Sequence, residues 1–308
     1  MSLIALVAAL LLQKFRPFTD PDPLSGWLHR LADWVERYAN AGERRYGVLA
    51  WFAVMLIVFV PVTLAWHLLY SAAALLGWLS AIVVLYLAIR FRAVLSEFNR
   101  IQRALRQENL DEARDRLARW LDHPALDLER GQIARAAIEY AVLHCYRGLF
   151  GVLFWFLLLP GPAGALVYRA TLILGERWQT PVEPDAYVFG WFARRMATIM
   201  DWIPQRLTAI SFAIVGDFED ALYCWRSQAQ WWGNALEGVV LAAAAGALGV
   251  RLGEPLDLAD GVLYRPSLGL GEGAETDHMQ STEGLIWRAV VLWMVVLLLV
   301  ALVQILTL

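Results

Sequence analysis

Lysine is almost absent from this 308-residue sequence. It occurs once, at Lys14, although lysine and arginine together number 26. A P-loop needs a lysine directly after its glycines, and Lys14 stands in the string LLQKF instead. This excludes a P-loop ATPase. The other basic residues are arginines, which suit carboxylate or phosphate pairing, although codon bias accounts for the same preference.

Cysteine and histidine are also scarce. The two cysteines, Cys145 and Cys224, lie far apart in apolar surroundings, so neither a disulfide framework nor a four-ligand zinc site is available. The five histidines show no HExxH spacing, and no GxSxG elbow or strand–helix–strand context for a dinucleotide is present. We therefore predict no metal and no cofactor.

Charge is missing from a long stretch, because residues 47–89 contain no Asp, Glu, Lys or Arg. The chain as a whole is 59% hydrophobic, with a mean hydropathy of +0.50 and fifteen tryptophans. About 20 apolar residues cross a hydrocarbon core of about 30 Å, so we predict a membrane protein. The net charge of −3 offers no basic field for nucleic acid, which we exclude as a partner.

The N-terminal third predicts membrane elements. Residues 3–12 form a short apolar run without the flanks of a signal peptide, which indicates an uncleaved anchor or half-helix. Residues 27–38 carry Trp and Leu at helical spacing and predict an amphipathic helix. Residues 47–89 are long enough for a transmembrane hairpin that turns near Tyr70 and Ser71.

Both flanks of this hairpin are rich in arginine, and a hairpin returns to its starting side. The positive-inside rule therefore places both flanks in the cytoplasm. The second flank, residues 91–147, predicts a small cytoplasmic helical lobe in which Asn109 caps a helix and Glu112 completes the capping box.

The remaining chain, residues 148–308, predicts a membrane core. Its first part, 148–172, is interrupted by PGPAG and is either a kinked span or a broken, re-entrant pair of half-helices. Asp201 is placed to cap a helix with Pro204 in its first turn. Residues 251–284 predict a polar, glycine-rich loop, and 285–308 a terminal span.

Taken together, these features predict an all-α polytopic helical membrane protein of four to six membrane segments, divided into 1–90, 91–147 and 148–308. Polar residues in apolar surroundings indicate where a ligand would bind, because charge at membrane depth needs a reason. We predict that one polar cavity at the cytoplasmic side binds a small anionic ligand. Its residues would be Glu139, His144, Arg147, Tyr168, Arg169, Asp201 and Arg206. In the competing account, Asp201 is only a cap and both Arg169 and Arg206 extend to lipid headgroups.

Three strings carry a family resemblance: AAIEYAVLHCYRGLFGVLFWFLLLPGPAGALVYRA (136–170), DWIPQRLTAI (201–210) and AAGALGVRLGEP (244–255). In this order, with a hydrophobic C-terminus, they resemble the CobD/CbiB and AmpE superfamily of bacterial inner-membrane proteins. For its CobD/CbiB branch, the resemblance implies an adenosylcobinamide-phosphate synthase, an ATP-dependent amide ligase that joins an aminopropanol unit to adenosylcobyric acid.

The chain departs from that branch at acidic and amide positions. Where those enzymes carry Glu-Asn followed by Asp and Gly, it has Leu143, His144, Arg147 and Gly148. Where they carry paired Asp residues before an Asn-aromatic-Ile-Pro motif, it has Ala197 and Thr198, with Asp201 in the Asn position. Their Gly-Arg-Asp-Thr motif is replaced by WLDHPALD (120–127).

Amide formation is expected to need carboxylates for Mg²⁺ and for proton transfer, and most of these candidates are missing. The positions that persist are Glu139, Tyr168, Arg169, Pro204 and Arg206. This pattern resembles AmpE. It favours a non-enzymatic sensor linked to cell-wall recycling and β-lactamase induction, with a cytoplasmic amidase as partner. The amide ligase of cobalamin biosynthesis is the alternative.

Overall fold

The computed structural model describes residues 2–15, 23–121, 128–159, 161–178, 188–258 and 261–306. Within these ranges the chain is almost entirely helical, which confirms the all-α fold class. The helices are α1 (Ser2–Phe15), α2 (Pro23–Ala39), α3 (Arg44–Ala72), α4 (Ala74–Ala88), α5 (Phe91–Arg106), α6 (Leu110–Leu121), α7 (Arg130–Cys145), the π-helix η1 (Tyr146–Phe150), α8 (Gly151–Leu158), α9 (Ala163–Arg177), α11 (Trp191–Val215), α12 (Phe218–Gln228), the 3₁₀ helix η2 (Ala229–Trp231), α13 (Ala235–Leu248) and α14 (Thr276–Leu306). The strands are β1 (Arg251–Leu252), β2 (Leu256–Leu258), β3 (Gly261–Leu263) and β4 (Leu268–Gly269).

Four helical stretches of the described chain are long and apolar enough to cross a membrane. They are Arg44–Ala72, Ala74–Arg106, Arg130–Leu158 and Thr276–Gln304. The second joins α4 and α5 across a two-residue break, where Ile89 is extended. The third joins α7, η1 and α8. These stretches confirm a polytopic helical membrane protein.

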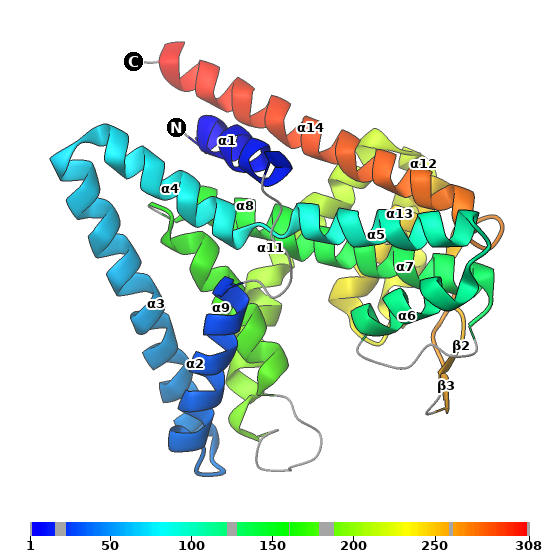
Figure 1. Ribbon diagram of the computed structural model, residues 1–308, viewed down its shortest axis with the longest axis horizontal. Helices are drawn as coiled ribbons and strands as arrows, with labels where there is room; N and C mark the ends of the chain where they lie inside the picture. The colour runs from blue at the N-terminus through cyan, green and yellow to red at the C-terminus, as the bar shows by residue number, and fades with distance from the viewer. Residues whose placement is uncertain are drawn as a thin grey trace. The chain divides into compact units, whose positions relative to one another are not determined.

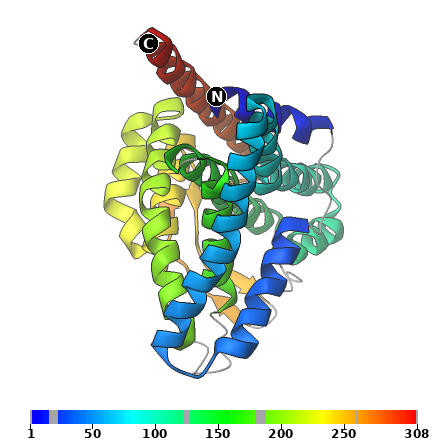
Figure 2. The same ribbon diagram turned by 90° about the vertical axis from the view of Figure 1, so that its left-hand side faces the viewer.

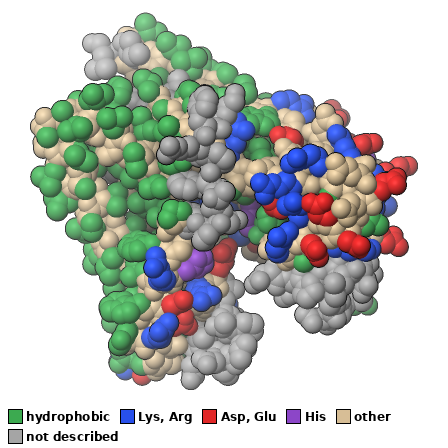
Figure 3. Space-filling model, in the orientation of Figure 1, with side chains coloured by type: hydrophobic (Ala, Val, Ile, Leu, Met, Phe, Trp, Pro, Cys, Tyr) green, Lys and Arg blue, Asp and Glu red, His purple; other side chains and the backbone are tan. Residues whose placement is uncertain are grey.

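The uncharged run forms the predicted hairpin. Its turn is at Ala73, which is extended between α3 and α4 (φ −160°, ψ 132°), two residues beyond Ser71. Large apolar side chains remain exposed along both helices, among them Leu49, Leu56 and Leu75. On the face in Figure 3, hydrophobic side chains cover this hairpin. An exposed apolar surface of this extent fits lipid rather than water.

The chain divides into two compact units. The first unit contains residues 1–90 and 148–203, and the second contains 91–147 and 204–308. In the first unit, α2 packs on α3 and α9, and α4 packs on α1 and α9. Figures 1 and 2 show that a short loop joins the end of α2 to the start of α3. The three-part division expected from the sequence stays a prediction.

The predicted amphipathic helix is α2, but its apolar stripe is split. Leu28 and Val35 are buried against the first unit, whereas Trp34 and Tyr38 are exposed. Exposed aromatic side chains at the edge of a helix are suited to a membrane interface, where one end of the ring meets water.

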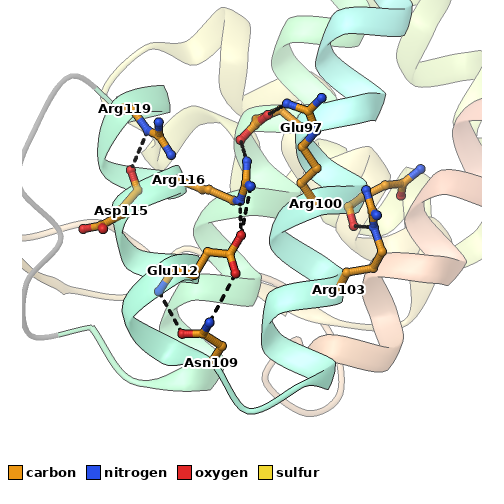
Figure 4. A network of polar contacts seen from close by, with 9 residues as sticks. Glu97, Arg100, Arg103, Asn109, Glu112, Asp115, Arg116 and Arg119 are labelled. Atoms are coloured by element: carbon orange, nitrogen blue, oxygen red, sulfur yellow. Dashed lines mark hydrogen bonds and ion pairs between the residues drawn. The ribbon is translucent and has the colours of Figure 1, made fainter.

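Helices α5 and α6 belong to the second unit and pack on α7. Asn109 accepts from the backbone N–H of Glu112 at 3.2 Å, so the predicted cap at the start of α6 is confirmed. Arg116 donates to Glu112 in its own helix and to Glu97 of α5, each at 2.9 Å (Figure 4). Ion pairs between partly exposed side chains such as these contribute little to stability. Residues 122–127, most of the WLDHPALD string, lie outside the described ranges.

The PGPAG string separates two helices, so residues 148–172 do not form one kinked span. Helix α8 ends at Leu158, Gly161 adopts the left-handed φ of +74°, and α9 begins at Ala163. The two helices pack closely, because a Cβ at Gly164 would overlap the carbonyl oxygen of Trp155. Glycine is required at this contact.

The prediction that Asp201 caps a helix is wrong. Both Asp201 and Pro204 lie inside α11, a continuous helix of 25 residues. Proline cannot donate to the carbonyl four residues earlier, which here is that of Met200. The indole Nε1 of Trp155 donates to this oxygen at 3.1 Å. A side chain of a neighbouring helix thus supplies the missing donor, and the helix continues through the proline.

The C-terminal region agrees with the sequence-based prediction in part. Helix α11 ends before Gly216, and Asp217 caps α12 by accepting from the N–H of Asp220 at 3.0 Å, as predicted. The expected loop at 251–284 is shorter than predicted, because α14 already begins at Thr276. The loop also contains two small antiparallel sheets, β1 with β4 and β2 with β3. Polar residues in the first turns of α14 hid its start.

Candidate functional site

A buried tyrosine–aspartate pair lies in the first unit. The Tyr168 hydroxyl of α9 donates to the Asp201 carboxylate of α11 at 2.6 Å, and both side chains are buried. Space for the hydroxyl depends on Gly151 of α8, because a Cβ there would overlap it. A carboxylate this deep in a membrane protein is costly, and such residues are usually retained for function.

Arg169 follows Tyr168 and is also buried, with 8% of its surface exposed. It donates to the Ser25 hydroxyl of α2 at 2.8 Å. Its guanidinium therefore points into the first unit and does not reach lipid headgroups. For this arginine, the competing account from the sequence is wrong.

A polar seam joins α2 to the end of α9. Arg177 holds Asp33 through two hydrogen bonds, at 2.6 Å and 3.1 Å. The hydrogen bond from Arg177 lowers the pKa of Asp33. Burial, with the Arg177 and Arg169 charges, lowers the pKa of His29 against the opposing effect of Glu176 and Asp33. The folded protein therefore favours a neutral His29.

We expect this seam to weaken in mild acid. An unfolded histidine binds a proton below about pH 6.5, whereas folded His29, with its lowered pKa, resists it, so stability falls as the pH drops below that point. The melting temperature of the purified protein should decrease between pH 7.5 and 5.5. The decrease should be smaller in His29→Leu than in the wild-type protein. In His67→Leu, which changes an exposed position on α3, the decrease should equal that of the wild-type protein. An equal decrease in the wild-type protein and His29→Leu would contradict the assignment.

A buried carboxylate organises the second unit. Glu139 of α7 accepts from the backbone N–H of Gly253 at 2.7 Å, and its other oxygen pairs with Arg265. The same arginine donates to the carbonyl of Glu254 at 3.2 Å and lies 5.6 Å from the ring centre of Trp232. Glu139 thus fastens the segment after α13 to α7.

The fastened segment has an unusual backbone. Gly253 (φ +77°) and Glu254 (φ +68°) both adopt left-handed conformations, which cost a side-chain-bearing residue free energy. The Glu254 carboxylate pairs with Arg135 of α7 and, at 3.0 Å, with Arg251. These ion pairs, together with the hydrogen bonds of Arg265, hold the strained turn in place.

The other predicted residues of the second unit have separate partners. Arg147, within the π-helix η1, pairs with Glu237 of α13 at 3.0 Å. His144 stacks on Tyr140, with ring centres 3.6 Å apart. With the Gln205 amide in the orientation that satisfies its neighbours, its oxygen accepts from Arg206 at 2.7 Å.

The structure therefore places the seven predicted residues in two groups. Tyr168, Arg169 and Asp201 belong to the first unit, and Glu139, His144, Arg147 and Arg206 to the second. Their meeting in one cavity stays a prediction. Sequence reasoning missed several of their partners, namely Ser25, Glu237, Gly253 and Arg265. One signal was available, because Arg251 and Arg265 are the only basic residues between 251 and 284.

Within the described residues, no three His, Cys, Asp or Glu side chains come together to hold a metal ion.

Comparison with known proteins identifies the family. A family profile described as CobD/Cbib protein matches residues 3–286, almost the whole chain. The chain belongs to the CobD/CbiB family. A protein of Stutzerimonas stutzeri named cobalamin biosynthesis protein CobD is 36% identical over 274 residues, which cover 87% of this chain and 88% of that protein. A protein of the same name from Chromobacterium violaceum is 33% identical over 78% of this chain and 76% of its own length. No solved structure matches the chain.

These relatives overturn the preferred functional interpretation from the sequence. The chain is not shown to belong to an AmpE-like branch, and the interpretation of the chain as a sensor of β-lactamase induction is wrong. The error came from weighing a few motif acids above similarity along the whole chain. Carboxylates act through their position in space, and the fold brings Asp201 and Glu139 to partners that are distant in sequence.

Proposed function

We propose that this CobD/CbiB protein is a membrane enzyme of cobalamin biosynthesis that forms an amide bond. The observation that carries the proposal is the 36% identity to a cobalamin biosynthesis protein CobD over nearly the full length of both chains. In the proposed reaction, a corrinoid carboxylate is activated by a nucleoside triphosphate and then attacked by the amine of an aminopropanol derivative. The carboxylate loses one oxygen to the released phosphate, and the amine loses its proton.

The Tyr168–Asp201 pair supports this proposal. An amine attacks only after a proton has left it, and a buried carboxylate hydrogen-bonded to a phenol can accept or relay that proton. The nucleoside triphosphate and the corrinoid carboxylate are anionic, which fits the expectation of an anionic ligand and the arginines among the predicted site residues. Location in the inner membrane, with residues 91–147 facing the cytoplasm, belongs to the same proposal.

A complementation experiment tests the function. We expect the chain to restore cobalamin production in a bacterium from which the gene for its own CobD/CbiB protein has been deleted. The Stutzerimonas stutzeri relative serves as the positive control, and added amide product should restore production without either protein. Membranes containing the chain should also form the amide from the two substrates and a nucleoside triphosphate. Failure of both assays, with the chain present in the membrane and the control active, would reject the proposal.

A further inference from the structure

Helix α11 has the reverse of the polarity pattern found in soluble proteins. From Ile199 to Ile214, every exposed residue is apolar: Ile199, Trp202, Ile203, Leu207, Ile210 and Ile214. Because the helix is continuous, its own geometry places these residues on one stripe, at spacings of three, four, seven and eight. Their exposed fractions run from 37% to 55%.

The opposite face of α11 is polar and buried. Asp201, Gln205, Thr208 and Ser211 are each no more than 6% exposed. Asp201 accepts from Tyr168, the Thr208 hydroxyl donates to the Pro204 carbonyl at 2.8 Å, and Ser211 accepts from Trp293 at 2.9 Å. A helix surrounded by water would turn its polar side outward. This helix turns it inward, where partners satisfy it.

The geometry points to α11 as a further membrane-spanning helix, whose apolar stripe contacts the acyl chains of the lipid bilayer. Its 25 residues extend about 37 Å at 1.5 Å per residue, which exceeds a hydrocarbon core of about 30 Å. Length and mean hydropathy alone do not mark α11 as a span, because the average over the helix includes Asp201, Gln205 and Arg206. Lipid would contact only the outer face, where the exposed side chains are all apolar; Arg206, between Trp202 and Ile210 on the same stripe, is partly buried and donates to Gln205.

The start of α11 and the comparison with α3 support lipid as the partner of the apolar stripe. Near its start, Trp191 is exposed and Arg195 follows one turn later, as is common where a helix leaves the bilayer. Helix α3, a candidate span by composition alone, exposes Leu49 and Leu56 in the same manner. This inference is independent of the proposed enzymatic function.

Spin labelling of the full chain in liposomes tests it. In a background with Cys145→Ala and Cys224→Ala, nitroxides are attached at Ile203→Cys, Ile210→Cys and Ile214→Cys. Collisions of each label with oxygen, which concentrates in lipid, are compared with collisions with a water-soluble nickel complex. We expect high oxygen and low nickel accessibility at all three positions. The calculated depth should pass through a maximum along α11.

Matched positions define the possible outcomes. Leu56→Cys on α3 is the lipid reference, Asp115→Cys on α6 is the water reference, and Thr208→Cys on the inner face should show low accessibility to both reagents. High nickel accessibility on the stripe would place it in water and overturn the inference. Low accessibility to both reagents would mean that protein covers the stripe, and this would also overturn it. A depth that increases from one end without a maximum would reject a complete crossing.

Discussion

Replacing Glu139 with alanine should destabilise the protein by about 3–5 kcal/mol, because removing one partner of a buried ion pair leaves the other charge without compensation. Glu139 is 4% exposed, and its two oxygens are engaged by Gly253 and Arg265. The strained conformation of Glu254 depends on the same contacts, so the segment from β1 to β3 should loosen as well. The free energy of unfolding in detergent, followed by circular dichroism, measures the effect.

Two further variants separate a buried pair from an ordinary surface contact. Glu43→Ala removes an ion pair with Arg45 in which both side chains are more than half exposed, and should cost at most about 1 kcal/mol. The double variant Glu139→Leu with Arg265→Met removes both charges and should be more stable than Glu139→Ala. A loss below about 1 kcal/mol in Glu139→Ala would show that the carboxylate is not buried as described.

Sequence reasoning found the elements whose pattern is local. The uncharged run 47–89 fixed the hairpin of α3 and α4, because burial in lipid requires only length and composition. Asn109 and Asp217 were correctly recognised as caps, since a cap is satisfied within its own turn. The resemblance to the superfamily also came from the chain itself, through three strings of fixed order.

Sequence reasoning failed where a contact between distant segments decides the outcome. Pro204 is a typical first-turn residue, and only the Trp155 indole from α8 explains why α11 passes through it. In the same way, Glu139 gave no sign that it would meet Gly253, which lies 114 residues away. Asp201 and Pro204 together resemble a helix start, so the full extent of α11 was hidden. These contacts are tertiary, and one sequence does not reveal them.

Replacing Asp201 with asparagine should reduce amide formation by about 100-fold or more, which is the usual contribution of a general acid or base. Asparagine keeps the shape of the side chain and can still accept from the Tyr168 hydroxyl, but it carries no charge and cannot take up a proton. The fold should therefore persist while the reaction slows. The rate is measured in membranes that contain equal amounts of each variant.

Tyr168→Phe provides the second half of this prediction. Removing the hydroxyl deprives the carboxylate of a charge-assisted hydrogen bond, which contributes about 1.5–3 kcal/mol. If the pair acts as a unit, combining Tyr168→Phe with Asp201→Asn should slow the reaction little more than Asp201→Asn alone. Thr208→Val is the matched control on the same buried face of α11, because the Thr208 hydroxyl bonds only its own helix in the described contacts. If Asp201→Asn slows the reaction no more than Thr208→Val, the pair is structural. If the double variant loses activity by the product of the two single losses, the two side chains act separately.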